Sequence, residues 1–170
     1  MLSRKLQDAI NEQIQKELHS EYIYLSIAAY FKSRDLDGIA NFFFVQTQEE
    51  HFHALKLFNY LIDRGGTVVL KEIPAPPVTF NSAIEAFEKT LEHEQFITKS
   101  INDLMDLAIK ENDHALVSFL KWYVDEQIEE EATASRLLNR VKLTGESGPG
   151  LFMIDSELSK RTFTPPASGE

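Results

Sequence analysis

The chain has 170 residues, which is the size of one domain with a sizeable core. Its 17 basic and 27 acidic residues give a formal net charge of −10, which disfavours nucleic-acid phosphates and anionic membrane surfaces as partners and favours cations. The absence of cysteine from the sequence excludes disulfides, thiolate metal sites, iron–sulfur clusters and cysteine nucleophiles. Any metal ion must therefore be bound by oxygen and nitrogen.

The first residues carry no sign of an export or membrane signal. Gln7 and Asp8 interrupt the apolar pattern before any run long enough for a signal peptide or a membrane span. We therefore expect a cytoplasmic protein that binds neither nucleic acid nor membranes.

The first half of the chain predicts two long helices joined by a short turn. Apolar residues recur at spacings of three and four over about 6–33, which is typical of an amphipathic helix. After a turn, Asp37 is expected to cap a second helix over about 39–64, and Gly65–Gly66 ends it. So short a connection places the two helices antiparallel and side by side.

A long segment without helical pattern follows. Residues 67–80 include Pro74, Pro76 and Pro77, which forbid a helix there. About 15 extended residues can span the roughly 40 Å of one long helix. The segment is therefore predicted to cross over, so that the third helix begins at the same end of the bundle as the second.

The second half of the chain predicts two further long helices and a short one. A capping box at 82–85 starts the third helix, Asn112–Asp113 separates it from the fourth, and the glycine-rich residues 145–150 end the fourth. The predicted ranges are about 83–110, 114–143 and 151–160. The sequence thus predicts one all-α domain over 1–170, a four-helix bundle with one long crossover (up-down-down-up) and a short C-terminal fifth helix.

A possible metal site begins with Glu50 and His53 on the second helix. Residues three apart share one helical face, but this spacing also occurs by chance on solvated faces. The other three long helices each carry a carboxylate near their middle: Glu17, Glu94 and Glu130. Since the middles of the helices in a bundle meet at one height, the sequence predicts that these side chains converge.

Convergence of several carboxylates predicts a multivalent cation. Buried carboxylates repel one another and lose hydration, so they must be protonated or neutralised by cations. Oxygen ligands with one imidazole suit iron, manganese or zinc, and a carboxylate at Glu50 that bridges two ions would hold them about 3.5–4 Å apart.

The chain resembles the non-haem ferritins of bacteria and archaea over essentially its whole length. The resemblance is carried by Glu17, Tyr24, the run Gln46–His53, Glu94 and the run Trp122–Glu131. It implies a ferritin-like fold and an iron-storage protein with ferroxidase activity. In that family two Fe(II) ions per chain reduce dioxygen together, and the ferric product is stored as mineral inside a hollow shell of 24 subunits.

The resemblance also implies roles for single residues. Glu17, Glu50 and His53 would bind the first iron ion, and Glu50, Glu94 and Glu130 the second. Gln127 would lie beside this centre as a hydrogen-bonding partner, and Tyr24 would form a hydrogen bond near it. Four acids match the additional third iron site of prokaryotic ferritins: Glu49, Glu126, Glu129 and Glu130.

The sequence differs from related families at positions that decide whether haem is bound. Bacterioferritins carry a second Glu-x-x-His on the fourth helix, where this chain has Gln127 and Glu130, and bind haem through a methionine near position 52, where this chain has Phe52. We therefore expect no haem. Four other histidines, for which the sequence offers no partner, are expected on the surface: His19, His51, His93 and His114.

Alternatives to a storage ferroxidase are a di-iron peroxidase or oxygenase on the same scaffold and a shell subunit that does not oxidise iron. The third-site acids argue against an organic substrate, and the complete ligand set argues against a subunit without the centre. The same residues are compatible with a homo-oligomer or a hetero-oligomer and with oxygen or peroxide as the oxidant. They are also compatible with either storage or detoxification as the main role.

Overall fold

The structure, a computed structural model, describes residues 2–145 and 148–165. Within those residues it consists of helices and connecting segments, without strands. The helices follow in the predicted order, and their bounds differ from the predicted ones by less than a turn. They are α1 (Arg4–Lys32), α2 (Asp37–Asp63), α3 (Ala83–Lys110), α4 (His114–Thr144) and α5 (Pro149–Leu158).

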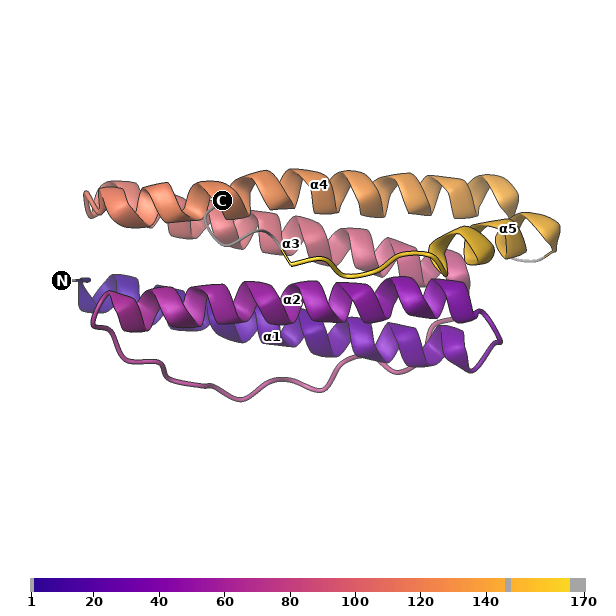
Figure 1. The fold of residues 1–170 in the computed structure, drawn as a ribbon, viewed down its shortest axis with the longest axis horizontal. Helices are drawn as coiled ribbons and strands as arrows, with labels where there is room; N and C mark the ends of the chain where they lie inside the picture. The colour runs from indigo at the N-terminus through magenta and orange to yellow at the C-terminus, as the bar shows by residue number, and fades with distance from the viewer. Residues whose placement is uncertain (1, 146–147, 166–170) are drawn as a thin grey trace.

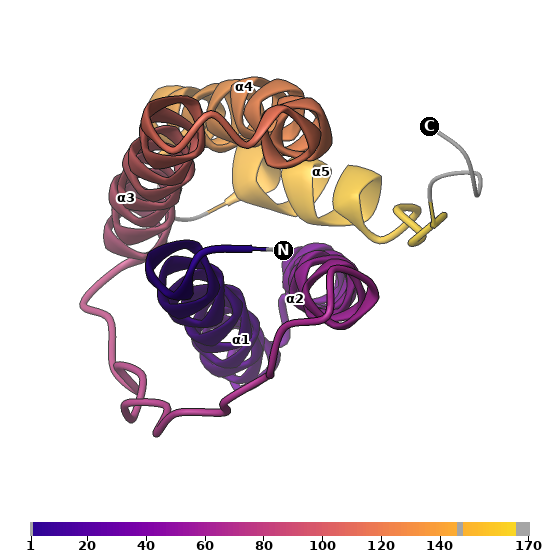
Figure 2. The same ribbon diagram turned by 90° about the vertical axis from the view of Figure 1, so that its left-hand side faces the viewer.

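The four long helices form the predicted up-down-down-up bundle (Figure 1). The helix pairs α1–α2 and α3–α4 are each antiparallel, and α3 begins at the end of the bundle where α2 begins. Viewed end-on, the crossover between α2 and α3 runs on the outer side of α1 (Figure 2). In the described part of the chain, none of the helices is both long and apolar enough to span a membrane.

Polar side chains of α1 hold the crossover in place. The Asn11 amide donates to the carbonyl of Thr67 at 2.9 Å and its oxygen accepts from the N–H of Val69 at 2.7 Å. Further along, the Ser26 hydroxyl donates to the carbonyl of Pro77 at 2.6 Å. These bonds satisfy backbone groups that an extended segment cannot pair within itself.

Capping residues fix the starts of α3 and α4. The Ser82 hydroxyl accepts from the N–H of Glu85 at 3.0 Å, as the predicted capping box requires. Asp113 accepts from the N–H of Leu116 at 2.9 Å and is paired with Arg64, whose two terminal nitrogens lie 3.1 and 2.8 Å from its carboxylate oxygens. The end of α2 is thereby tied to the turn between α3 and α4.

The start of α2 is capped by the fifth helix and not, as predicted, by Asp37. Leu36 is the N-cap residue and makes no side-chain bond, while Asp37 already lies in the first turn. The buried Asp155 carboxylate of α5 accepts from the N–H of Ile39 at 2.8 Å. The helices approach so closely that a Cβ on Gly38 would lie 1.7 Å from the Asp155 carbonyl oxygen, which explains the glycine.

The apolar core of the bundle is divided into two clusters by a polar layer. One cluster, near α5, contains the stacked rings of Phe31 and Phe43, 5.7 Å apart. The other, at the opposite end, contains Leu57 and Leu120. Between them, buried polar side chains project from all four long helices: Gln13, Glu17, Ser20, Gln46, Glu50, His53, Glu94, Gln127 and Glu130. A layer of this kind costs stability unless its groups are paired or bind a ligand.

Candidate metal centre

The centre of the polar layer is formed by Glu17 of α1 with Glu50 and His53 of α2. One potential ligand atom from each side chain lies within 4.8 Å of the others. All three residues are at most 3 % exposed, and His53 Nδ1 is 3.6 Å from Glu50 Oε2. The predicted convergence of α1 and α2 at this height is therefore observed.

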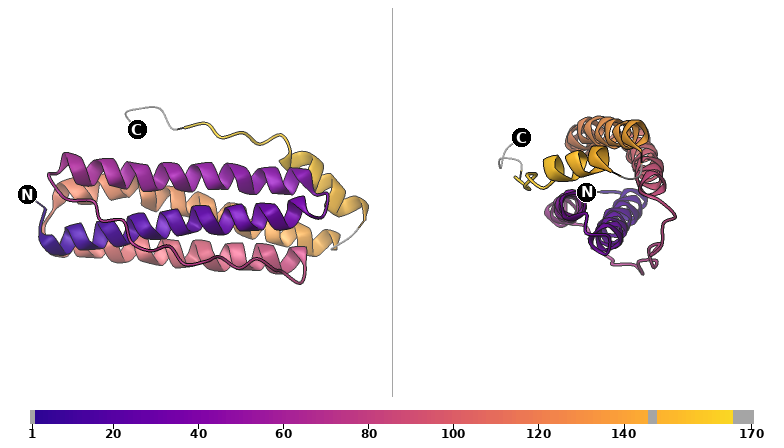
Figure 3. Two further views of the ribbon diagram at one scale, coloured as in Figure 1. Left: turned by 90° about the horizontal axis from the view of Figure 1, so that it is seen from below. Right: turned by 90° about the vertical axis from the view of Figure 1, so that its right-hand side faces the viewer.

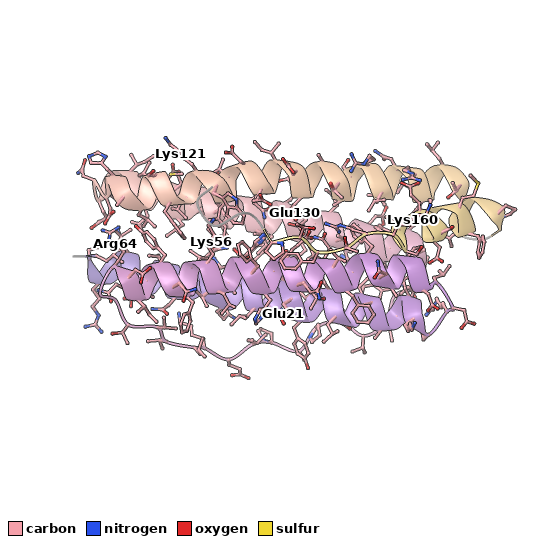
Figure 4. The ribbon with its side chains drawn as sticks, in the orientation of Figure 1. Glu21, Lys56, Arg64, Lys121, Glu130 and Lys160 are labelled. Carbon is pink, nitrogen blue, oxygen red and sulfur yellow. The ribbon has the colours of Figure 1, made fainter. Side chains whose placement is uncertain are left out.

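Glu94 of α3 and Glu130 of α4 complete the layer from the other side. Both residues are buried, and Glu130 points into the space between α4 and α2 at mid-bundle (Figure 4). Among the described residues, however, only Glu17, Glu50 and His53 bring three ligand atoms within 4.8 Å of one another. The two acids thus flank the tighter group.

Four buried polar atoms in this layer have no hydrogen-bond partner within the described part of the chain. They are Glu17 Oε2, Glu50 Oε2, His53 Nδ1 and Glu94 Oε2. Each such atom costs about 1–3 kcal/mol, and more when charged. Three of them belong to the Glu17–Glu50–His53 group, which could hold a multivalent cation, and the fourth comes from α3 in the same layer. The four atoms are only oxygen and imidazole nitrogen, which suits iron, manganese or zinc.

Neutral hydrogen-bond donors orient three of the carboxylates and leave their other oxygens available. Gln13 donates to Glu17 Oε1 at 2.8 Å and Gln46 donates to Glu130 Oε2 at 2.9 Å. The Tyr24 hydroxyl donates to Glu94 Oε1. Hydrogen-bond partners of this kind fix the orientation of a carboxylate and leave the lone pairs of its other oxygen free to bind a metal ion.

Burial raises the pKa of the acids in this layer. The pKa of Glu50 and of Glu94 lies well above the ordinary value, with neighbouring carboxylates as a further cause. For Glu17, burial raises the pKa to about 6, and the pKa of Glu130 is raised for the same reason. Without a metal ion the layer therefore carries protons at neutral pH, and metal binding must release them.

The imidazole of His53 is already in its ligand form. Burial lowers its pKa to about 4, with Lys56 adding to the effect, so the ring is neutral at physiological pH, as a metal ligand must be. The Tyr123 hydroxyl donates to the His53 carbonyl oxygen at 2.7 Å, and the Trp122 ring packs edge-on at 5.3 Å between centroids. These contacts hold the helix segment and the ring in place.

Gln127 and three acids at the edge of the layer, which we call the outer acids, lie around this centre: Glu49, Glu126 and Glu129. Gln127 is buried and accepts from the Thr98 hydroxyl at 3.0 Å. Glu126 is half-buried and Glu129 is exposed, so these acids of α4 lie towards the surface. Burial raises the pKa of Glu126, with neighbouring carboxylates as a second cause.

Glu49, the remaining outer acid, is paired with an arginine from the far end of the chain. Arg161 Nη2 lies 3.0 and 2.7 Å from its two carboxylate oxygens. Burial raises the pKa of Glu49 to about 7, against the opposing effect of the arginine. This pair could not be predicted from the sequence, because Arg161 follows the last predicted helix and belongs to no periodic pattern.

The expectation that His93 lies on the surface is wrong. The residue is half-buried, one ring nitrogen lies 2.7 Å from the Ser20 hydroxyl oxygen, and the ring packs edge-on against Tyr24. Burial lowers the pKa of His93 to about 4. His93 lies three residues after Thr90 and one before Glu94, and both of these residues are buried. This spacing places His93 beside the buried face of α3, so the helical pattern of the sequence could have predicted its burial.

The fold and the layer together define a four-helix-bundle protein in which a buried carboxylate–histidine group inside one chain could hold a metal ion. The sequence matches the Ferritin-like domain family over residues 7–144. The chain belongs to this family.

Individual relatives agree with that assignment along the chain. A bacterial non-heme ferritin of Campylobacter jejuni is 43 % identical over 155 residues, covering 91 % of this chain and 93 % of its own. One of Staphylococcus saprophyticus is 39 % identical over 163 residues, covering 96 % and 98 %. The structure is similar to an open pore ferritin from Archaeoglobus fulgidus, with a TM-score of 0.94, 44 % identity, and coverage of 95 % and 99 %. A humanized archaeal ferritin gives a TM-score of 0.96 at 44 % identity, with coverage of 97 % and 100 %.

Proposed function

We propose that this chain is the subunit of an iron-storing shell and that it oxidises Fe(II) with dioxygen at the buried carboxylate–histidine layer. The observation that carries the proposal is the set of four buried polar atoms at the centre of the bundle that have no hydrogen-bond partner among the described residues. Relatives named as bacterial non-heme ferritins support iron as the ion.

In this proposal each ligand has a defined task. Glu17 and His53 bind the first Fe(II), Glu94 and Glu130 bind the second, and Glu50 bridges the two ions. Each ion gives one electron to the same dioxygen molecule, so that the pair reduces it by two electrons without release of superoxide. The chain contributes the geometry and negative charge that hold both ions in one pocket.

Hydrogen-bonding residues keep this pocket ready for iron. Tyr24 holds one oxygen of Glu94 and leaves the other available, and Gln46 does the same for Glu130. As iron binds, the acids lose protons that the buried layer otherwise retains. Iron binding is therefore coupled to proton release.

The shell and the outer acids complete the proposal. Exposed apolar side chains favour burial against further copies of the chain, among them Leu25, Val78 and Phe152, which are 42 %, 73 % and 68 % exposed. The proposed assembly is the homo-oligomeric 24-mer of the family, acting in the cytoplasm. A third iron site, through which ferric ions pass towards the mineral, is assigned to four acids: Glu49, Glu126, Glu129 and Glu130.

The test is anaerobic loading of the purified apo-protein with Fe(II), followed by exposure to air. We expect a transient visible absorption at about two irons per chain and retained iron that co-elutes with a large particle on a sizing column. Glu50→Ala should abolish the transient. Glu92→Ala, which removes an exposed acid of α3, should leave it intact.

Other outcomes separate the parts of the proposal. A transient without retained iron would refute storage and favour a di-iron redox enzyme. A full transient in Glu50→Ala would refute the assignment of the centre.

A further inference from the structure

The segment after α5 turns back along α2 (Figure 3). We call residues 159–165 the tail. Asn41 of α2 donates to the backbone carbonyl oxygen of Arg161 at 2.9 Å. Two residues later, the Phe163 ring packs against Phe52, with 6.3 Å between centroids. The tail is thus anchored at both the first turns and the middle of α2.

Both terminal nitrogens of the Arg161 guanidinium group, which lies in this tail, form hydrogen bonds. Nη2 contacts both oxygens of Glu49 at 3.0 and 2.7 Å, and Nη1 donates to Gln46 Oε1. The group also lies 4.6 Å from the centre of the Phe42 ring. The side chains of Arg161 and Glu49 are only 27 % and 22 % exposed, so solvent screens the pair less than an ordinary surface ion pair.

The contact with Gln46 extends to the metal centre. Gln46 is 2 % exposed and donates its amide to Glu130 Oε2 at 2.9 Å. Arg161 is therefore bonded directly to Glu49 and, through one buried amide, to Glu130. These are two of the four acids that the proposed function assigns to the third iron site.

We propose that Arg161 is the resident cation of this outer acidic site, and that an incoming metal ion binds there only after it displaces the guanidinium from Glu49. The inference rests on the proposed function, because it takes Glu49, Glu126, Glu129 and Glu130 as the ligands of a third ion. Both oxygens of Glu49 are engaged by one cation, so a second cation must compete for them and is repelled by the first.

As a positioning residue, Arg161 has two effects on the outer site. It lowers the affinity for the third ion, and it directs the Gln46 amide so that Glu130 keeps a fixed orientation. A lysine would retain the charge but cannot reach two partners with one planar fork. Charge and geometry can therefore be separated by substitution.

The test is calorimetric titration of the assembled apo-protein with Zn²⁺, which does not change oxidation state. We expect two tightly bound ions and one weaker ion per chain in the unaltered protein. Arg161→Ala should tighten the weaker class by about fivefold, as expected for removal of a partly buried ion pair that competes with the metal. Arg161→Lys should stay close to the unaltered protein in this affinity.

Matched controls identify the site. Arg140 forms a similar pair with Glu157, with distances of 3.0 and 2.6 Å, on the surface between α4 and α5, and Arg140→Ala should change no binding class. Glu49→Gln should abolish the weaker class in either background at position 161. Anomalous diffraction from Zn²⁺-soaked crystals should place the weaker ion at the outer acids, with higher occupancy in Arg161→Ala.

An unchanged or weakened third ion in Arg161→Ala would overturn the inference, provided that particle size and helix content match those of the unaltered protein. The absence of any ion at the outer acids in both proteins would overturn it as well. Failure of the proposed ferroxidase centre is recognised separately, because it would abolish the two tight ions. Of their five proposed ligands only Glu130 is linked to Arg161 in the described part of the chain, through Gln46.

Discussion

Replacing Glu17 by glutamine should make the apo-protein more stable at neutral pH while impairing metal binding. Burial raises the pKa of Glu17 from 4.5 to about 6, whereas the unfolded chain has an ordinary carboxyl group. The folded state therefore holds the proton more tightly, and stability falls as pH rises from 4.5 through 6. The rise of the Glu17 pKa from 4.5 to about 6 corresponds to about 2 kcal/mol. Glutamine does not titrate, and its carbonyl can still accept from Gln13.

The assay is urea unfolding of chelator-treated protein at pH 4 and pH 7.5, in which the loss of helix is measured by circular dichroism. The stability of Glu17→Gln relative to the unaltered protein should rise by about 2 kcal/mol between these two pH values. Glu12→Gln, on the exposed face of the same helix, should show no such change. A difference for Glu17→Gln that is the same at both pH values would refute the reasoning.

Metal affinity, the Tyr24 hydroxyl and Gly38 can each be tested as well. His53 is neutral above about pH 5, whereas the buried acids carry protons. The affinity for Zn²⁺ should therefore rise with pH through the neutral range. Calorimetry in buffers of different ionisation enthalpy should detect the released protons. Tyr24→Phe leaves a buried oxygen of Glu94 unpaired, so we expect a loss of about 1–3 kcal/mol in apo-protein stability by urea unfolding and slower iron oxidation in stopped-flow absorption. Unchanged oxidation would contradict the orienting role. Gly38→Ala forces α5, which carries Asp155, away from α2, so the thermal midpoint should fall by the equivalent of about 1–3 kcal/mol. An unshifted midpoint would contradict the close contact.

Local sequence patterns determined most of the fold. Apolar spacing and turn residues predicted the five helices, and the proline-containing crossover predicted their directions. The cap of α2 was missed because Asp155 lies 116 positions from Ile39, and no local pattern reports a contact between helices so distant in sequence.

The candidate metal centre likewise combines features that local patterns predict with contacts that they do not. The residues of the candidate centre were accessible from the sequence because carboxylates at the middle of four helices must meet in a bundle. Their hydrogen-bond partners, such as Gln13 and Gln46, were not, since a glutamine on a helix has the same local pattern whether it faces solvent or a ligand. Arg161 was inaccessible for a stronger reason, because only the course of the tail along α2 brings it to Glu49.

The division of the core into two apolar clusters has a consequence for turnover of the protein. In the empty bundle the polar layer between the clusters opposes folding, and bound ions remove that opposition, so the loaded chain unfolds less often than the empty one. Protease digestion and heat treatment should therefore eliminate empty subunits first. The site that we propose for iron would in this way also determine which copies of the chain persist.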